Sequence, residues 1–309
     1  MRAVILAGGT GGAKLAAGMQ DILGDQLTVI VNTADDTEAL GVHVSPDPDL
    51  VTYWLTNEID AERGWGIKDD SFTVFDRLVK LGSPSWFGLS DRDLATCLRR
   101  TALLAAGGRQ TEVQCGISQA LGARARVVTM SDNPVRTRVR TAAGWFGLQE
   151  YLIREGAGEV ADVEFSQIEN AAPSAEALDA IDCADLIVVG PSNPVISIGP
   201  ILGLPGMREA IGSAGAPVVA VSPYVGGEIL KGPTNDFMRA RGHETDVSGV
   251  IAAYDGLLDG IVVDSGDPGP PPHGIEAAVF PTLMDGPDSR RAVASQVLEF
   301  ASSRAKARG

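Results

Sequence analysis

The sequence predicts an α/β protein with a doubly wound, mainly parallel sheet and a helical insertion. Three observations predict this fold class. Short β-rich apolar runs alternate with helical segments, several of the runs end in glycine-rich or polar turns, and a long, mainly helical stretch separates two of them. The chain has 309 residues, of which 44% are hydrophobic and 21% charged, so it is long enough for a large globular core.

The N-terminal stretch is the strongest single signal. Residues 2–7 form a mostly apolar, β-favouring run, glycines crowd residues 8–12, and a helical pattern begins at Lys14. Glycines let the backbone approach a ligand, and a helix N-terminus offers free N–H groups and a partial positive charge to an anion. The spacing matches neither the dinucleotide nor the P-loop pattern. The stretch therefore predicts phosphate binding, and the alternative is a turn needed only for close packing.

The remaining segments follow in the order that a parallel sheet requires. A second apolar strand at 27–32 completes a right-handed βαβ unit with the first strand and helix. Residues from about 45 to 123 form the insertion, with helices expected at 49–55, 71–81, 91–106 and 111–121. Further strands are expected at 125–130, 136–141, 184–189, 216–221 and 260–264, helices at 147–153, 207–211 and 288–306, and a proline-rich connector at 267–273. We therefore expect one Rossmann-like domain over residues 1–309.

The charge and cysteine content exclude several classes of protein. Lys and Arg number 25 against 40 Asp and Glu, and the net charge of -15 repels nucleic acids and anionic membranes. The three cysteines have neither disulfide-framework nor zinc-site spacing. The N-terminal apolar run is too short for a signal peptide, and no run approaches the roughly 18 residues that span a membrane. We expect a cytoplasmic protein that binds neither nucleic acid nor membrane.

The polar residues at the expected strand ends form the candidate site. The carboxyl ends of parallel strands meet at one crevice, and polar or glycine-rich turns follow four strands, at 8–12, 32–36, 190–199 and 222–227. Mg²⁺ is typically held by one or two carboxylates together with ligand phosphates. The metal candidates are therefore Asp35, Asp36, Asp47 and Asp49. Taken singly, each is explained as well by a solvated loop or a helix cap, and their clustering favours the metal site.

Two further segments carry candidate binding residues. Gly190, Ser192 and Asn193 offer backbone N–H groups, a hydroxyl and an amide to a second phosphate, and the alternative is a proline-fixed turn capped by its own side chains. Arg92, near a helix start, has a guanidinium suited to a phosphate or a ring carbonyl. Neither a Ser-His-Asp order nor a Cys-His pair emerges, which favours direct displacement at phosphorus over covalent catalysis.

These motifs together resemble a known family. The segments at 7–15, 31–36, 44–49, 64–66, 89–96, 130–135, 190–202 and 221–223 are similar, in this order, to those of the 2-phospho-L-lactate transferase family of coenzyme F-420 biosynthesis. The likeness runs from about residue 2 to residue 284. The Asp-Arg-Asp segment at 91–93 and the Gly-Pro-Ser-Asn-Pro segment at 190–194 are its most specific parts.

The resemblance implies an activity and roles for the candidate residues. It implies transfer of a phospholactyl-type group from a guanosine-diphosphate-activated donor to the ribityl hydroxyl of the deazaflavin Fo, with Mg²⁺ and with release of GMP. Asp47 or Asp49, together with Arg92, would hold Fo, and the two aspartates are the catalytic candidates. The resemblance also implies a homodimer. The nucleotide phosphates would lie against Gly8, Gly9, Thr10, Gly11, Gly12, Lys14, Gly190, Ser192 and Asn193.

Two questions stay open at this point. The donor carries lactate, enolpyruvate or glycerate, and the sequence does not separate these groups. The alternative function is a nucleotide-sugar-binding regulatory protein of the same superfamily, which shares the glycine turn and the Ala-Asp-Asp sequence at 34–36. Such proteins continue with a glycine- and serine-rich loop that contains arginine, whereas this chain continues with Thr37 and an acidic, apolar stretch, which favours the transferase.

Overall fold

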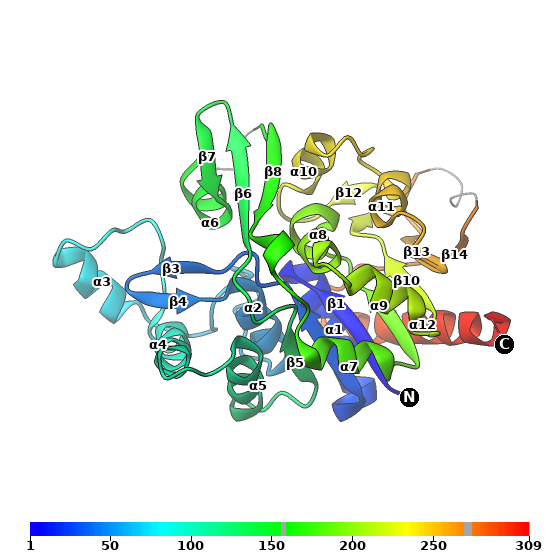
Figure 1. Ribbon diagram of the computed structural model, residues 1–309, viewed down its shortest axis with the longest axis horizontal. Helices are drawn as coiled ribbons and strands as arrows, with labels where there is room; N and C mark the ends of the chain where they lie inside the picture. The colour runs from blue at the N-terminus through cyan, green and yellow to red at the C-terminus, as the bar shows by residue number, and fades with distance from the viewer. Residues whose placement is uncertain (156–158, 269–273, 309) are drawn as a thin grey trace.

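The core of the protein is a parallel sheet, seen in a computed structural model that describes residues 1–155, 159–268 and 274–308 (Figure 1). Seven strands form it in the order β14-β13-β10-β9-β1-β2-β5, and every neighbouring pair is parallel. This confirms the predicted Rossmann-like, doubly wound fold. The strands are β1 (Ala3–Ala7), β2 (Leu27–Val31), β5 (Arg126–Thr129), β9 (Leu186–Val189), β10 (Val218–Val221), β13 (Gly260–Asp264) and β14 (Glu276–Phe280).

The strand order reverses at the centre of the sheet. From β1 the chain moves outward through β2 to β5, and it then returns to the other side of β1 for β9, β10, β13 and β14. Open α/β sheets bind ligands at such a reversal, beyond the carboxyl ends of the strands. The loops after β1 and β9 therefore define where a ligand site is expected.

Two apolar cores sandwich the sheet, because successive side chains of a strand point to opposite faces. Ala3, Ile5 and Ala7 of β1 belong to one core, while Val4 and Leu6 belong to the other. The first core is covered by α1 (Gly9–Leu23), α2 (Pro46–Leu55) and α12 (Pro287–Arg308). The second is covered by α7 (Ala175–Asp182), α8 (Gly199–Gly203), α9 (Met207–Ser213), α10 (Thr234–Ala240) and α11 (Val247–Tyr254).

A mainly helical excursion separates β2 from β5. It contains the short hairpin β3 (Thr37–Ala39) and β4 (Val42–Val44), then α2, α3 (Thr73–Lys80), α4 (Asp91–Ala105) and α5 (Gln110–Ala120). Its outer part has a small apolar core of its own, which includes Val42, Leu89 and Cys97. The helix α2 packs against α1, so the excursion is anchored directly beside the sheet. The hairpin was not predicted, since three-residue strands leave little periodic signal.

A second excursion, between β5 and β9, is largely β-structure. The strands β6 (Arg136–Thr141), β7 (Gly144–Gly147) and β8 (Asp162–Ser166) form an antiparallel sheet in the order β7-β6-β8. It stands away from the central sheet in Figure 1. The excursion also contains α6 (Leu148–Glu150), the π-helix η2 (Tyr151–Glu155) and the 3-10 helix η3 (Ile168–Asn170). The helix predicted at 147–153 is thus a short α-helix that continues as a π-helix.

The remaining elements are short. They are the 3-10 helix η1 (Gly24–Gln26), the π-helix η4 (Pro194–Ile198), and the hairpin β11 (Tyr224–Val225) and β12 (Glu228–Ile229). Of the predicted proline-rich connector, residues 269–273 lie outside the described part of the chain. Among the helices that the structure describes, none has the length and apolarity needed to cross a membrane.

Candidate functional site

A large cavity opens at the reversal of strand order. Its volume is about 1040 Å³, and its walls include the loops after β1 and β9. The first turn of α1 forms one wall and the start of α2 another. Most of the predicted binding residues line it, namely Gly8, Gly9, Thr10, Gly11, Lys14, Asp35, Asp47, Asp49, Ser192 and Asn193.

The glycines after β1 permit a very close approach of three loops. The helix α1 begins at Gly9 rather than at Lys14, so the predicted glycine turn is the first turn of the helix. A Cβ atom on Gly8 would lie 2.5 Å from an oxygen of Asp47, and one on Gly11 would lie 2.0 Å from the carbonyl oxygen of Pro191. Neither distance is sterically possible. These two glycines therefore satisfy a packing requirement, because a side chain at either position would push the neighbouring loop away.

The second glycine-rich segment is joined to the first by a hydrogen bond. The backbone N–H of Gly8 donates to Oγ of Ser192 over 3.2 Å. The side-chain oxygen of Asn193 accepts from the backbone N–H groups of Val195 and Ile196, and so caps the π-helix η4. The capping role that the sequence left open for Asn193 is thus present in the structure.

Asp35 and Asp47 form a carboxylate pair held by one amide. The Nδ2 atom of Asn32 donates to Oδ1 of Asp35 and to Oδ2 of Asp47, each over 2.9 Å. The second oxygen of Asp47 accepts from the backbone N–H of Gly9 over 2.7 Å, which ties the carboxylate to the start of α1. All three polar side chains are buried. The structure therefore brings together two of the four predicted metal ligands at the end of β2.

Burial makes both carboxylates of this pair reluctant to ionise. It raises the pKa of Asp47 to about 6, although the hydrogen bonds from Asn32 and Gly9 act in the opposite direction. Burial also raises the pKa of Asp35 well above its usual range, and the negative charge of Asp47 adds to this effect. A divalent cation would relieve the repulsion, and paired carboxylate oxygens are the ligands that Mg²⁺ prefers.

Asp36 points away from this pair. Its Oδ2 atom accepts from the side chain of Gln110 and lies 3.0 Å from Nε2 of His43. The ring of His43 also contacts Glu38. Although burial alone lowers the pKa of His43, the hydrogen bond and the charge of Asp36 raise it. Asp36 thus interacts with the insertion and is absent from the described residues that line the cavity.

Asp49 lines the cavity, but its charge is compensated. The guanidinium of Arg100 donates to both carboxylate oxygens, with 2.9 Å between Nη1 and Oδ2. Arg100 is only 1% exposed, and Gln114 accepts from it over 3.3 Å. Gln114 in turn donates to Thr52 of α2 over 3.0 Å. This buried ion pair fixes α2 against α4 and α5.

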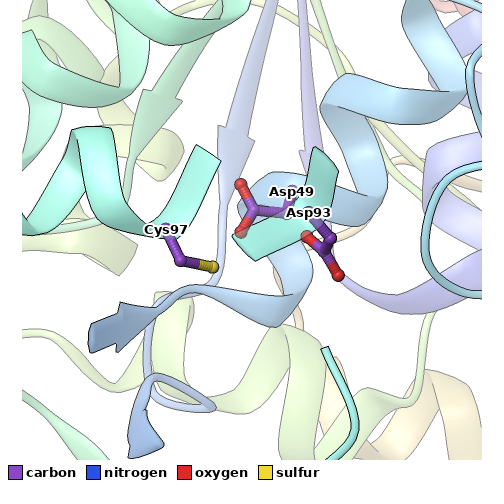
Figure 2. A group of neighbouring side chains, drawn as sticks. All are labelled: Asp49, Asp93 and Cys97. Carbon is purple, nitrogen blue, oxygen red and sulfur yellow. The ribbon is translucent and has the colours of Figure 1, made fainter. Parts of the chain in front are cut away.

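Asp93 and Cys97 of α4 lie beside Asp49 (Figure 2). One carboxylate oxygen from each aspartate and the thiol sulfur lie within 4.8 Å of one another. Tyr53 donates to Asp93 over 2.8 Å. Burial, followed by the charge of Asp49, raises the pKa of Asp93 to about 7, and burial raises that of Cys97. Because Arg100 already binds both oxygens of Asp49, the cation of this cluster is the guanidinium.

Sequence reasoning missed Arg100, Tyr53 and Gln114. The signal for Arg100 was present, since Asp93, Cys97 and Arg100 follow each other at the i, i+4 and i+7 spacing that puts residues on one helix face. The predicted Arg92 lies elsewhere. Its side chain is 52% exposed, donates to the carbonyl of Lys68, and is absent from the described cavity lining. Its role toward a ligand stays a prediction.

Aromatic side chains also line the cavity. They are Trp54, Trp65, Trp86 and Phe87. Trp65 is 46% exposed, and the guanidinium of Arg63 lies 5.1 Å from the centre of its ring. The fold and the site thus define a Rossmann-like protein whose cavity is lined by acidic groups, by the N-terminus of α1 and by flat apolar rings.

Comparisons with known proteins identify the family. The family described as "2-phospho-L-lactate transferase CofD" matches residues 3–277. A phosphoenolpyruvate transferase of Streptomyces griseus is 41% identical over 97% of this chain and 98% of its own length. A 2-phospho-L-lactate transferase of Methanosarcina mazei is 39% identical over 85% of this chain and 87% of its own length. The chain therefore belongs to the CofD family of transferases, as the sequence motifs predict.

Solved structures with the same fold include protein BH3568 of Bacillus halodurans. It aligns with 96% of this chain and 99% of its own chain, with a TM-score of 0.63 and 19% sequence identity. At that identity the likeness extends to the fold alone.

Proposed function

We propose that this chain transfers a phosphoenolpyruvyl or phospholactyl group from a guanosine-diphosphate-activated donor to the ribityl hydroxyl of the deazaflavin Fo, and releases GMP. The observation that carries the proposal is the Asp35–Asp47 pair, held by Asn32 and joined to the N-terminus of α1 by the N–H of Gly9. This arrangement joins a cation site to an anion site at one end of the cavity. Transfer of a phosphoryl group from a diphosphate needs both the cation site and the anion site, because the diphosphate is an anion that a metal ion must partly neutralise.

Asp35 and Asp47 fit a bound Mg²⁺. Their oxygens are hard ligands, they share one amide donor, and burial raises the pKa of both. When bound there, Mg²⁺ would neutralise charge on the diphosphate and on the departing GMP. The N–H groups at the start of α1 and the ammonium of Lys14 would hold the phosphate oxygens and align the distal phosphorus.

The acceptor would occupy the aromatic side of the cavity. Trp65 and Trp86 offer flat surfaces for a deazaflavin ring. Asp49 presents a carboxylate that Arg100 has already neutralised, so it can accept hydrogen bonds from an uncharged ring or ribityl chain without adding net charge. The acceptor hydroxyl then attacks the distal phosphorus, and its proton passes to a cavity carboxylate. The loose transition state of phosphoryl transfer makes little demand on the strength of that base.

The longest alignments support an enolpyruvyl group on the donor. The phosphoenolpyruvate transferases of Streptomyces griseus, Thermobifida fusca and Streptomyces coelicolor each align with 97% of this chain, and that of Kitasatospora aureofaciens aligns with 86%. The 2-phospho-L-lactate transferases of Methanosarcina mazei and Methanosarcina acetivorans each align with 85%, and that of Methanococcoides burtonii aligns with 91%.

Product analysis tests this proposal. The purified chain is incubated with Fo, Mg²⁺ and guanosine diphosphate whose distal phosphate bears enolpyruvate, lactate or glycerate. We expect mass spectrometry to find GMP and Fo with an added phosphoenolpyruvyl group, and omission of Mg²⁺ to abolish both. Absence of any Fo adduct with all three donors, together with tight calorimetric binding of a UDP-sugar, would instead support the nucleotide-sugar-binding alternative.

A further inference from the structure

Three basic side chains line the cavity within the described part of the chain, and they differ in how their charges are compensated. They are Lys14, Arg63 and Lys231. Arg63 is paired with Asp60 at 2.8 Å and donates to the carbonyl of Ile67. Neither lysine has a carboxylate oxygen within 4.0 Å among the described residues. The two lysines are therefore the cations that the cavity offers to a ligand.

Lys14 lies one helical turn beyond the N-terminal glycines of α1. Its ammonium is 5.5 Å from the centre of the Trp54 ring, and the guanidinium of Arg290, from α12, lies 4.9 Å from the same centre. Burial lowers the pKa of Lys14, and the positive charges of Arg290 and Lys231 lower it further. Three positive charges are thus gathered at this end of the cavity, in a chain whose net charge is -15.

Lys231 enters the cavity from the loop after β12, two residues beyond the end of that strand. Its Nζ atom donates to the carbonyls of Arg63 and Gly64, each over 3.2 Å. Gly64 has φ +73°, and a Cβ atom there would lie 2.2 Å from Nζ, so the glycine leaves room for the amine. An ammonium has three donors, and the two carbonyl contacts leave one of them for a ligand.

The positions of the two lysines match the two charged parts of the proposed donor. The diphosphate belongs at the start of α1, which places it beside Lys14. The group on the distal phosphorus carries a carboxylate in each of the three candidate donors, only a few bonds from that phosphorus. Lys231 lies near enough to Lys14 for its positive charge to lower the pKa of Lys14, and Ile229 and Leu230, which precede it in the chain, also line the cavity. An ammonium at the edge of apolar side chains suits a small carboxylic acid.

We propose that Lys231 binds the carboxylate of the transferred group and thereby distinguishes the complete donor from guanosine diphosphate. This inference rests on the proposed function, because that function supplies the donor. The other source of negative charge is the diphosphate itself, which the donor shares with guanosine diphosphate. A comparison of the two ligands therefore separates carboxylate binding from phosphate binding.

Calorimetry with Mg²⁺ and without Fo provides the test, since no acceptor is present to consume the donor. The ligands are guanosine diphosphate and its enolpyruvyl derivative, measured with the wild type, Lys231→Met, Lys231→Arg and the control Lys80→Met. Lys80 ends α3 and lies outside the cavity lining. We expect Lys231→Met to bind the enolpyruvyl derivative roughly 10- to 100-fold more weakly, with guanosine diphosphate changed less than about twofold. Lys231→Arg should restore most of the loss, and Lys80→Met should match the wild type.

Two results would overturn the assignment. One is unchanged affinity of Lys231→Met for the enolpyruvyl derivative, and the other is an equal loss for both ligands, which would place Lys231 at the diphosphate. Failure of the proposed function is seen separately, because it is the absence of an Fo adduct in the product analysis. Thermal unfolding of each variant verifies that the loss of affinity occurs in a folded protein.

Discussion

Asp47 and Asp49 stand two residues apart in the first turn of α2, yet they belong to electrostatically opposite environments. Asp47 is paired with a second carboxylate, Asp35, and both are held by neutral donors. Asp49 is paired with a guanidinium, that of Arg100, which binds both of its oxygens. One helical turn therefore presents an uncompensated carboxylate to the sheet side of the cavity and a compensated one to the insertion.

The contrast separates a site that needs a ligand from one that completes the fold. Burial disfavours the ionised form of both carboxylates of the pair, and it therefore raises the pKa of Asp35 and of Asp47. A buried carboxylate that is matched by a guanidinium has its counter-ion within the protein. The Asp35–Asp47 pair on the sheet side is thus suited to bind a cation, whereas the Asp49–Arg100 ion pair on the insertion side holds α2 in place.

The largest effect should follow removal of the guanidinium. Arg100→Met leaves Asp49 buried without a counter-ion, and we expect the free energy of unfolding at pH 8 to fall by about 3–5 kcal/mol. Urea denaturation followed by circular dichroism measures it. Arg100→Met combined with Asp49→Leu should recover most of the loss, because it removes the orphaned charge. A loss below about 1 kcal/mol in the single variant would contradict the compensating role of Arg100.

The second effect concerns activity rather than stability. Asp47→Asn removes one of two carboxylates from the proposed cation site, so we expect turnover to fall about 10²- to 10³-fold. The free energy of unfolding should change by about 1 kcal/mol or less, because relief of the repulsion with Asp35 offsets a weakened hydrogen bond. Turnover with Fo, measured over a range of Mg²⁺ concentrations, tests the first expectation.

The matched control for this variant is Asp49→Asn. It should lower stability by leaving Arg100 buried and uncompensated, whereas Asp47→Asn should leave stability nearly unchanged. Asp69→Asn, at an exposed position outside the cavity, should change neither. Equal losses of stability in Asp47→Asn and Asp49→Asn would remove the distinction between the two carboxylates.

The strands of the sheet were predicted from the sequence more completely than the difference between Asp47 and Asp49. Buried parallel strands are continuous apolar runs, so β1, β2, β5, β9, β10 and β13 were found within a few residues. The edge strand β14 was missed because its residues are only partly buried or exposed, which weakens the apolar signal. Strand ends also located the cavity, since parallel topology brings those ends together.

The division among the four aspartates was beyond sequence reasoning. Clustering at strand ends grouped Asp35, Asp36, Asp47 and Asp49, but their separation depends on partners far away in the chain. Arg100 is 51 residues from Asp49, and Gln110 is 74 residues from Asp36. Which carboxylate meets which partner is decided by how the insertion folds back against α2. Tertiary contacts of this kind leave no periodic pattern in the sequence.

The smallest expected effect is a pH dependence of stability that arises from Asp93, on the insertion side. Asp93 lies on the insertion side, and burial together with the charge of Asp49 raises its pKa to about 7. A carboxyl group with a raised pKa stabilises the fold fully below its unfolded pKa near 4, and this contribution is lost as the pH rises through about 7. Asp93→Asn stays neutral and still offers an oxygen to Tyr53. We therefore expect the Tm of this variant minus that of the wild type to increase from pH 5 to pH 8.

The Tm of both proteins is measured by thermal unfolding at pH 5 and at pH 8. Because the two proteins share all other titratable groups, the effects of those groups cancel in the Tm difference. A gain of at least about 2 °C corresponds to a free-energy change of order 1 kcal/mol in a domain of this size. The same measurement on Asp69→Asn should show no gain, because that side chain is exposed. A parallel pH dependence of the wild type and Asp93→Asn would mean that Asp93 ionises freely, and the insertion side would then hold an uncompensated carboxylate beside the compensated Asp49.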